Sequence, residues 1–135
     1  MSREKVMEGI DLPPNDQKLN YATTVIEKFK KRVVYHKSIR AMSEKEYIDL
    51  HTLIVQVLEY VGELSMPAFN VQEELEKRYY RMYKHAPELA KKLYLEHYHD
   101  IHRPFNTLKN RCFTLLEEMD KNYFNINHKH PPKEF

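Results

Sequence analysis

The chain has 135 residues, of which 31% are charged, with a formal net charge of +2, two glycines and one cysteine. This length suits one domain with a real core, and the near-neutral charge argues against a tail that binds polyanions along its whole length. Two glycines argue against the glycine-rich loops of P-loop NTPases, Rossmann enzymes and α/β hydrolases, and a lone Cys112 excludes intrachain disulfides and cysteine-based zinc sites.

Residues 1–15 lack a hydrophobic period and contain Pro13-Pro14, a pattern that predicts an extended N-terminal arm. No apolar run in this stretch resembles a signal peptide, and no segment of the chain is apolar enough to span a membrane. We therefore expect an intracellular, non-secreted protein without membrane insertion. Asn15 or Asp16 is expected to cap a first helix over residues 16–41.

A second helix is predicted to start at the capping box formed by Ser43 and Glu46 and to end at Pro67. Its wide apolar stripe predicts the most buried helix of the set. The stripe consists of Tyr47, Leu50, Ile54, Val57, Leu58, Val61 and Leu64. A third helix is predicted from a cap at Asn70 to about His85. Its apolar side consists of Val71, Leu75, Tyr79, Met82 and Tyr83.

A fourth helix is predicted to begin at Pro87 and to stop or kink at Pro104. Its buried side consists of Leu89, Ala90, Leu93, His97 and Ile101. The apolar side of a fifth segment consists of Phe105, Leu108, Cys112, Leu115, Met119 and Tyr123. A polar, extended tail is predicted over 125–135. Since no window alternates like a strand, the sequence predicts an all-α bundle of four to five helices over residues 16–124, with extended N- and C-terminal arms.

The first helix carries the densest cationic stretch, with seven basic and two acidic residues between Asp16 and Arg40. Residues four apart share one side of a helix, so a single basic row is predicted. The row consists of Lys28, Arg32, His36 and Arg40, with Lys31 and Tyr35 beside it. The opposite, buried stripe consists of Ala22, Ile26, Phe29 and Val33. The row is either a solvated face or a ridge that contacts phosphates.

A second basic and aromatic stretch runs over residues 77–85. Arg78, Arg81 and Lys84 are spaced by three and are candidates for phosphate contacts, while Tyr79 and Tyr83 are expected in the core. The alternative interpretation is that these cations are ordinary solvated charges. Together with the first row, the predicted nucleic-acid site therefore comprises Lys28, Lys31, Arg32, His36, Arg40, Arg78, Arg81 and Lys84.

Two further patterns bear on catalysis. The histidines His97, His99 and His102 cluster, but the Glu-x-x-His pair ending at His99 has no second copy of the kind a di-iron bundle requires. We expect no metal, cofactor or small-molecule substrate. Separately, Arg78 and His85 resemble the Arg-x(4–6)-His signature of HEPN-type ribonucleases. That resemblance implies a helical, dimeric, metal-independent ribonuclease with His85 as general acid–base and Arg78 as phosphate stabiliser.

In its organisation most of the chain resembles the major coat proteins of filamentous archaeal viruses. The shared features are a short chain rich in Lys, Glu and Tyr, a proline-marked N-terminal arm, a basic first helix and no catalytic motif. The resemblance implies paired helical-bundle subunits that wrap duplex DNA in a virion, with the basic row, including Lys28 and Arg32, on the DNA backbone. The prediction is a non-enzymatic nucleic-acid-binding protein that self-associates. Two other hypotheses stay open: an adaptor or regulatory bundle that binds an acidic protein, and the HEPN-like ribonuclease.

Overall fold

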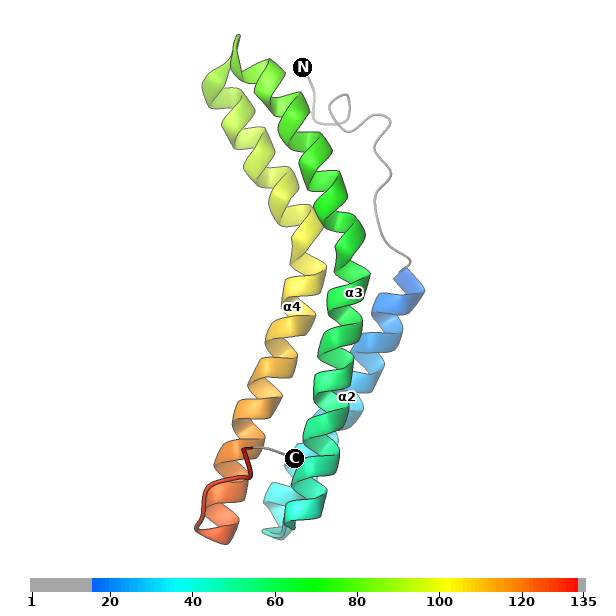
Figure 1. Cartoon of the computed structure of the whole chain (residues 1–135), viewed down its shortest axis with the longest axis vertical. Coiled ribbons are helices and arrows are strands. Elements are labelled where there is room, and N and C mark those ends of the chain that lie inside the picture. Colours follow the sequence, from blue (N-terminus) through cyan, green and yellow to red (C-terminus); the bar gives the residue numbers. More distant parts are fainter. Residues whose placement is uncertain (1–15, 134–135) are drawn as a thin grey trace.

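The computed structural model describes residues 16–133, and over this range the chain forms three α-helices and no strand (Figure 1). Helix α2 spans Asp16–Ile39, α3 spans Glu44–Tyr83 and α4 spans Pro87–Asn127. At a rise of about 1.5 Å per residue, the 40 residues of α3 and the 41 residues of α4 form rods about 60 Å long. The all-α prediction is confirmed, whereas the predicted number of four to five helices is wrong.

Helices α3 and α4 form a long antiparallel hairpin, and α2 lies along one half of it (Figure 1). The ring of Tyr21 packs edge-on against that of Tyr60, with 6.2 Å between the ring centroids. Because α2 runs antiparallel to α3, its first described residues lie near the level of Ser65. Where α2 lies against the hairpin, the three helices form a base. Beyond the base the hairpin continues, within the described residues, as a two-helix segment that we call the tip arm (residues 68–102).

Pro67 lies inside α3, so the helix end predicted there is wrong, and Pro104 lies inside α4, so of the stop or kink predicted there only a kink is compatible with the structure. A proline removes one backbone hydrogen bond, which costs about 3 kcal/mol in a helix interior. Both side chains are exposed, but buried residues flank them on either side, namely Val61, Ala68, Ile101 and Phe105. Burying a Val, Ile or Phe side chain contributes about 1.5–3 kcal/mol each. Packing before and after each proline therefore outweighs the local penalty, and the helices continue.

The two prolines lie at nearly the same level of the hairpin. On one side of them, His102 Nε2 is 2.8 Å from Gln72 Oε1, and on the other Lys109 Nζ is 3.4 Å from Ser65 Oγ. Both helices change direction in this region (Figure 1), and proline is a common cause of such bends. The bend separates the base from the tip arm.

The predicted capping box at the start of α3 is confirmed. Ser43 Oγ accepts a hydrogen bond from the Glu46 backbone N–H at 3.1 Å, and Glu46 Oε1 accepts one from the Ser43 backbone N–H at 3.0 Å. Two N–H groups that have no partner within the helix are thereby satisfied. These bonds from Ser43, with smaller contributions from the charges of His36 and Arg32, lower the pKa of Glu46.

Replacing Ser43 by alanine should lower the free energy of unfolding by about 1 kcal/mol, because one side of this reciprocal cap is lost. The pKa of Glu46 is lower in the folded chain than in the unfolded chain. The ionised carboxylate therefore contributes to the free energy of unfolding above the unfolded-state pKa, and this contribution is lost as the pH falls through the folded-state pKa. Urea unfolding at pH 7 and in the acid range measures both effects. Ser38→Ala is the control, because Ser38 is exposed near the end of α2; an equal loss there would contradict the cap's role.

The buried stripes predicted for the first and last helical segments are confirmed. Those residues are Ala22, Ile26, Phe29 and Val33 in α2 and Phe105, Leu108, Cys112, Leu115, Met119 and Tyr123 in α4. In the tip arm, however, Tyr83 and Leu89 were expected to be buried and are 54% and 43% exposed. Two helices alone bury only the narrow seam between them, so residues that flank the seam stay in contact with solvent.

Helix α4 continues through Asn127, three residues past the predicted end of the bundle at residue 124. Asn127 Nδ2 donates to Met42 O at 2.9 Å, which ties the end of α4 to the α2–α3 connection. The predicted N-terminal arm (residues 1–15) with its Asn15 cap, the side chain of Asp16, and residues 134–135 of the tail lie outside the described residues.

Candidate nucleic-acid interface

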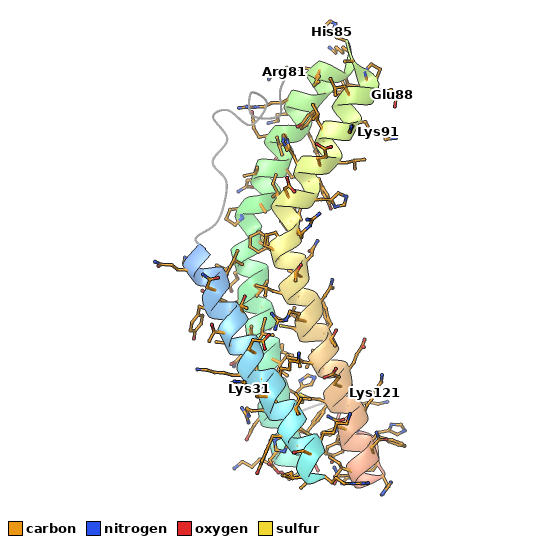
Figure 2. The ribbon with its side chains drawn as sticks, turned by 180° about the vertical axis from the view of Figure 1, so that it is seen from behind. Lys31, Arg81, His85, Glu88, Lys91 and Lys121 are labelled. Atoms are coloured by element: carbon orange, nitrogen blue, oxygen red, sulfur yellow. The ribbon has the colours of Figure 1, made fainter. Side chains whose placement is uncertain are left out.

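The outer face of α2 carries three of the predicted cationic residues. Lys28, Lys31 and Arg32 are all exposed, because the buried stripe of α2 turns toward the hairpin and these positions point away from it. Tyr35 lies among them and is 58% exposed. Figure 2 places Lys31 on this helix, in the base of the molecule. The prediction of an exposed cationic row therefore holds for these three positions, which we call the α2 ridge.

The α2 ridge forms no ion pair in the part of the chain that the structure describes, since none within 4.0 Å involves Lys28, Lys31 or Arg32. Between residues 17 and 39 the sequence contains a single acid, Glu27. Glu27 forms its ion pair with Arg111 of α4 and is held at the α2–α4 side. The ridge thus presents three cations to solvent, of which Arg32 also lies near enough to Glu46 to lower the pKa of that carboxyl.

His36 was predicted to belong to the exposed row, and this is wrong because the side chain is only 5% exposed. Position 36 follows Phe29 by seven residues and Val33 by three, so it continues the buried stripe. Its Nδ1 donates to Ala41 O at 3.0 Å and lies 3.6 Å from Glu46 Oε2. His36 therefore connects the end of α2 to the cap of α3 and is not available to a phosphate.

Arg40 leaves the row as well. It follows α2 in the left-handed conformation, with φ of 53°, and is exposed in the turn. With Lys37 and Asn122 it lines a cavity of about 230 Å³ next to the end of α4. In residues 16–133 it forms no ion pair within 4.0 Å, so it remains a cation beside the ridge rather than part of it.

The second predicted basic stretch lies at the opposite end of the molecule. Arg81 and His85 are at the tip of the hairpin, whereas Lys31 is in the base (Figure 2). Arg32 lies near Glu46, whose pKa it lowers, and Arg81 is 35 residues further along α3, or about 50 Å. The fold therefore does not unite the two basic stretches in one site.

Two cations of the second stretch already have partners within the hairpin. Arg78 Nε is 3.6 Å from Glu74 Oε1, and Lys84 Nζ lies 5.4 Å from the centroid of the Tyr80 ring. Arg81 is exposed. His85 is exposed in the turn after α3, where its backbone N–H bonds to Met82 O at 3.0 Å. Arg78 and His85 would have to converge on one phosphate to act as a ribonuclease pair, and this arrangement gives that alternative no support.

The histidine cluster on α4 takes part in packing. His97 is buried and its Nδ1 hydrogen-bonds to the Tyr79 hydroxyl, while the Nε2–H of His102 donates to Gln72 Oε1. Burial, and secondarily the charge of Lys109, lowers the pKa of His102, which favours its neutral form. His99 is exposed. Within residues 16–133 no group of three or more His, Cys, Asp or Glu side chains is arranged to hold a metal ion.

A groove near the end of the tip arm was not predicted. It has a volume of about 460 Å³ and is lined by Glu76, Tyr79, Tyr80, Tyr83, Ala90, Lys91 and Tyr94. We call it the tip groove. The sequence indicated one wall of this groove, because positions 76, 80 and 83 follow helical spacing directly beside the buried positions 75, 79 and 82. The α4 residues of the groove, Ala90, Lys91 and Tyr94, could not be predicted from local spacing, because the register of α4 against α3 depends on tertiary packing.

No protein-family model, curated protein or solved structure shows significant similarity to this chain. Across residues 16–133, none of the helices is both long enough and apolar enough to cross a membrane.

Proposed function

We propose that this protein is a non-enzymatic helical protein that binds nucleic acid through the α2 ridge and self-associates. The observation that carries the proposal is the group of three exposed cations, Lys28, Lys31 and Arg32, without an ion pair in the described residues. Clustered positive charge attracts a polyanion and gains free energy by releasing condensed counterions. The finer form of the proposal is a coat-like subunit that binds along duplex DNA in a virion.

The spacing of the ridge is compatible with contacts to a phosphate backbone. Lys28 and Arg32 are four residues apart, or about 6 Å along the helix axis, while phosphates of one DNA strand rise about 3.4 Å each. The ridge thus reaches about two to three phosphates. Contacts of this kind position a protein on a duplex without reading its sequence, so binding of moderate affinity with little sequence preference is expected.

The triple variant K28A/K31A/R32A should bind a duplex of any sequence more weakly and with a flatter salt dependence. Three phosphate contacts give a slope of about −2.7 in log K against log salt, which is a loss of about 40-fold between 50 and 200 mM salt. Fluorescence anisotropy with two unrelated duplexes and a single strand, over a salt series, measures affinity, slope and preference.

The control variant K77A/K92A/K121A removes the same charge from three exposed lysines elsewhere on the hairpin. It should keep most of the affinity and the slope, since the proposal is local to α2. If both triple variants lose affinity equally, net charge rather than the ridge drives binding. Unchanged binding in K28A/K31A/R32A would overturn the nucleic-acid part of the proposal.

The adaptor alternative is favoured by a separate observation. Large apolar side chains are exposed on α2 among the cations, namely Tyr21 at 64%, Val34 at 54%, Tyr35 at 58% and Ile39 at 47%. A mixed apolar and basic face suits an acidic protein partner whose binding includes apolar burial. Such binding would depend less on salt than binding to a duplex, and the salt series separates the two.

A further inference from the structure

The tip arm is a two-helix structure with an incomplete core. Its buried residues form one narrow seam, made by Ala68, Val71, Leu75, Tyr79 and Met82 of α3 and by Ala90, His97 and Ile101 of α4. In the base, α2 covers one side of the hairpin, whereas no described helix covers the tip arm. Exposed aromatic side chains remain on its flank, with Phe69 51% exposed, Tyr80 65% and Tyr83 54%.

These aromatic residues lie on the same side as the tip groove. Positions 69, 76, 80 and 83 are spaced by helical turns and therefore share one flank of α3. The groove brings Tyr80 and Tyr83 together with Tyr94 of α4, and the rings of Tyr79 and Tyr94 pack edge to face at 5.8 Å. At about 200 Å² per aromatic side chain, Tyr80 and Tyr83 leave about 240 Å² open at the groove, while Phe69 lies 11 residues before Tyr80, about 16 Å nearer the bend.

The tip groove carries opposite charges at its two ends. Glu76 lies toward the bend, where its Oε1 accepts hydrogen bonds from Tyr94 Oη at 3.0 Å and Gln72 Nε2 at 3.1 Å. Lys91 lies toward the tip, where α4 begins (Figure 2). Since Tyr79 pairs with His97 across the seam, Glu76 and Lys91 are separated by about 14 Å along the hairpin axis.

We propose that the tip groove is a self-association surface that binds the tip groove of a second copy of this chain. The two copies are related by a two-fold axis perpendicular to the helices, so that the outermost turns of the two tip arms form a short antiparallel four-helix bundle. This axis makes the two grooves antiparallel, so that Glu76 of each copy lies at the level of Lys91 of the other copy and two equivalent pairs of opposite charge result. A parallel pair would instead set both glutamates at one level and both lysines at another, where like charges repel.

This inference rests on the self-association part of the proposed function and names its surface. The open aromatic area supplies the centre of the interface, where aromatic anchors contribute most. The remaining flank, with the half-buried Tyr94 and Tyr98 and the stem of Lys91, extends it toward the roughly 800 Å² per partner of a standard interface. The α2 ridge lies in the base and stays open in such a dimer.

The test is sedimentation velocity of the full chain over a concentration series, without nucleic acid, for the wild type, E76K, K91E and the double variant E76K/K91E. The wild type should dimerise, and each single variant should raise the dimer dissociation constant about tenfold or more, because two pairs become repulsive contacts. The double variant should return to within about threefold of the wild type, since the exchanged charges again face each other.

The variant Y80A/Y83A should abolish the dimer, and Leu89→Ala is its control, since Leu89 is exposed at the tip without lining the groove. Circular dichroism verifies that each variant folds. If Y80A/Y83A dimerises as tightly as the wild type, the tip groove is not the self-association surface, although self-association itself stands. If E76K/K91E does not recover the dissociation constant lost in the single variants, the antiparallel register is overturned. A protein that is monomeric at every concentration overturns the surface and self-association together, while duplex binding by the α2 ridge stands or falls on the salt series.

Discussion

Replacing Phe105 by alanine should lower the free energy of unfolding by about 3–5 kcal/mol, the largest effect expected of any single substitution discussed for this chain. Phe105 is 1% exposed and follows Pro104 directly, at the joint between the base and the tip arm. Truncation removes a buried ring and leaves a cavity that the two stiff helices cannot fill. It also removes packing that offsets the hydrogen bond lost at the proline.

The matched control for this substitution is Phe113→Ala on the same helix. Phe113 is 50% exposed, so its truncation should cost less than about 1 kcal/mol. Urea unfolding followed by circular dichroism gives both values. Because Phe105 lies at the bend, hydrogen exchange in the variant should rise first in the tip arm, which lacks the support of α2. Equal losses for the two phenylalanines would contradict the described core.

Replacing Tyr79 by phenylalanine should lower the free energy of unfolding by about 1–3 kcal/mol. The change deletes only the hydroxyl group, which hydrogen-bonds to His97 Nδ1 inside the seam of the tip arm. Tyr79 is 4% exposed and His97 is 1% exposed, so water cannot easily replace the lost bond. The ring itself stays in place, so the effect isolates the polar contact from the apolar packing.

Tyr80→Phe is the control for the hydroxyl deletion. Tyr80 is the next residue along α3 and is 65% exposed, so loss of its hydroxyl should leave the free energy of unfolding within about 0.5 kcal/mol of the wild type. Thermal and urea unfolding of the two variants compare the positions directly. A Tyr79→Phe variant as stable as Tyr80→Phe would show that the bond to His97 contributes nothing to the fold.

Local patterns along the sequence predicted much of this structure. The stripe from Ala22 to Val33 and the stripe from Phe105 to Tyr123 are buried as expected, because helical spacing alone decides which residues share a face. The capping box at Ser43 also depends only on residues three apart. For the same reason the exposure of Lys28, Lys31 and Arg32 followed from the position of the apolar stripe.

Other features depended on contacts between distant segments. Pro67 predicted a helix end and Pro104 a stop or kink, since each removes a backbone hydrogen bond. Whether the helix nevertheless continues is decided by the burial of residues before and after the proline, and that burial comes from the opposite helix. His36 was predicted in the cationic row because it follows Arg32 by four residues, yet it also continues the buried stripe seven residues after Phe29, and it lies in the interior beside Glu46.

The sequence by itself determined that this protein is helical, where α3 begins, and which side of α2 carries its positive charge, because all of these follow from interactions within a few residues. Only the tertiary structure decided that three helices form in residues 16–133, that the two basic stretches lie about 50 Å apart, and that Glu76 and Lys91 share one groove. These outcomes depend on the register of α3 against α4, and that register is fixed by packing along the whole seam rather than by local spacing.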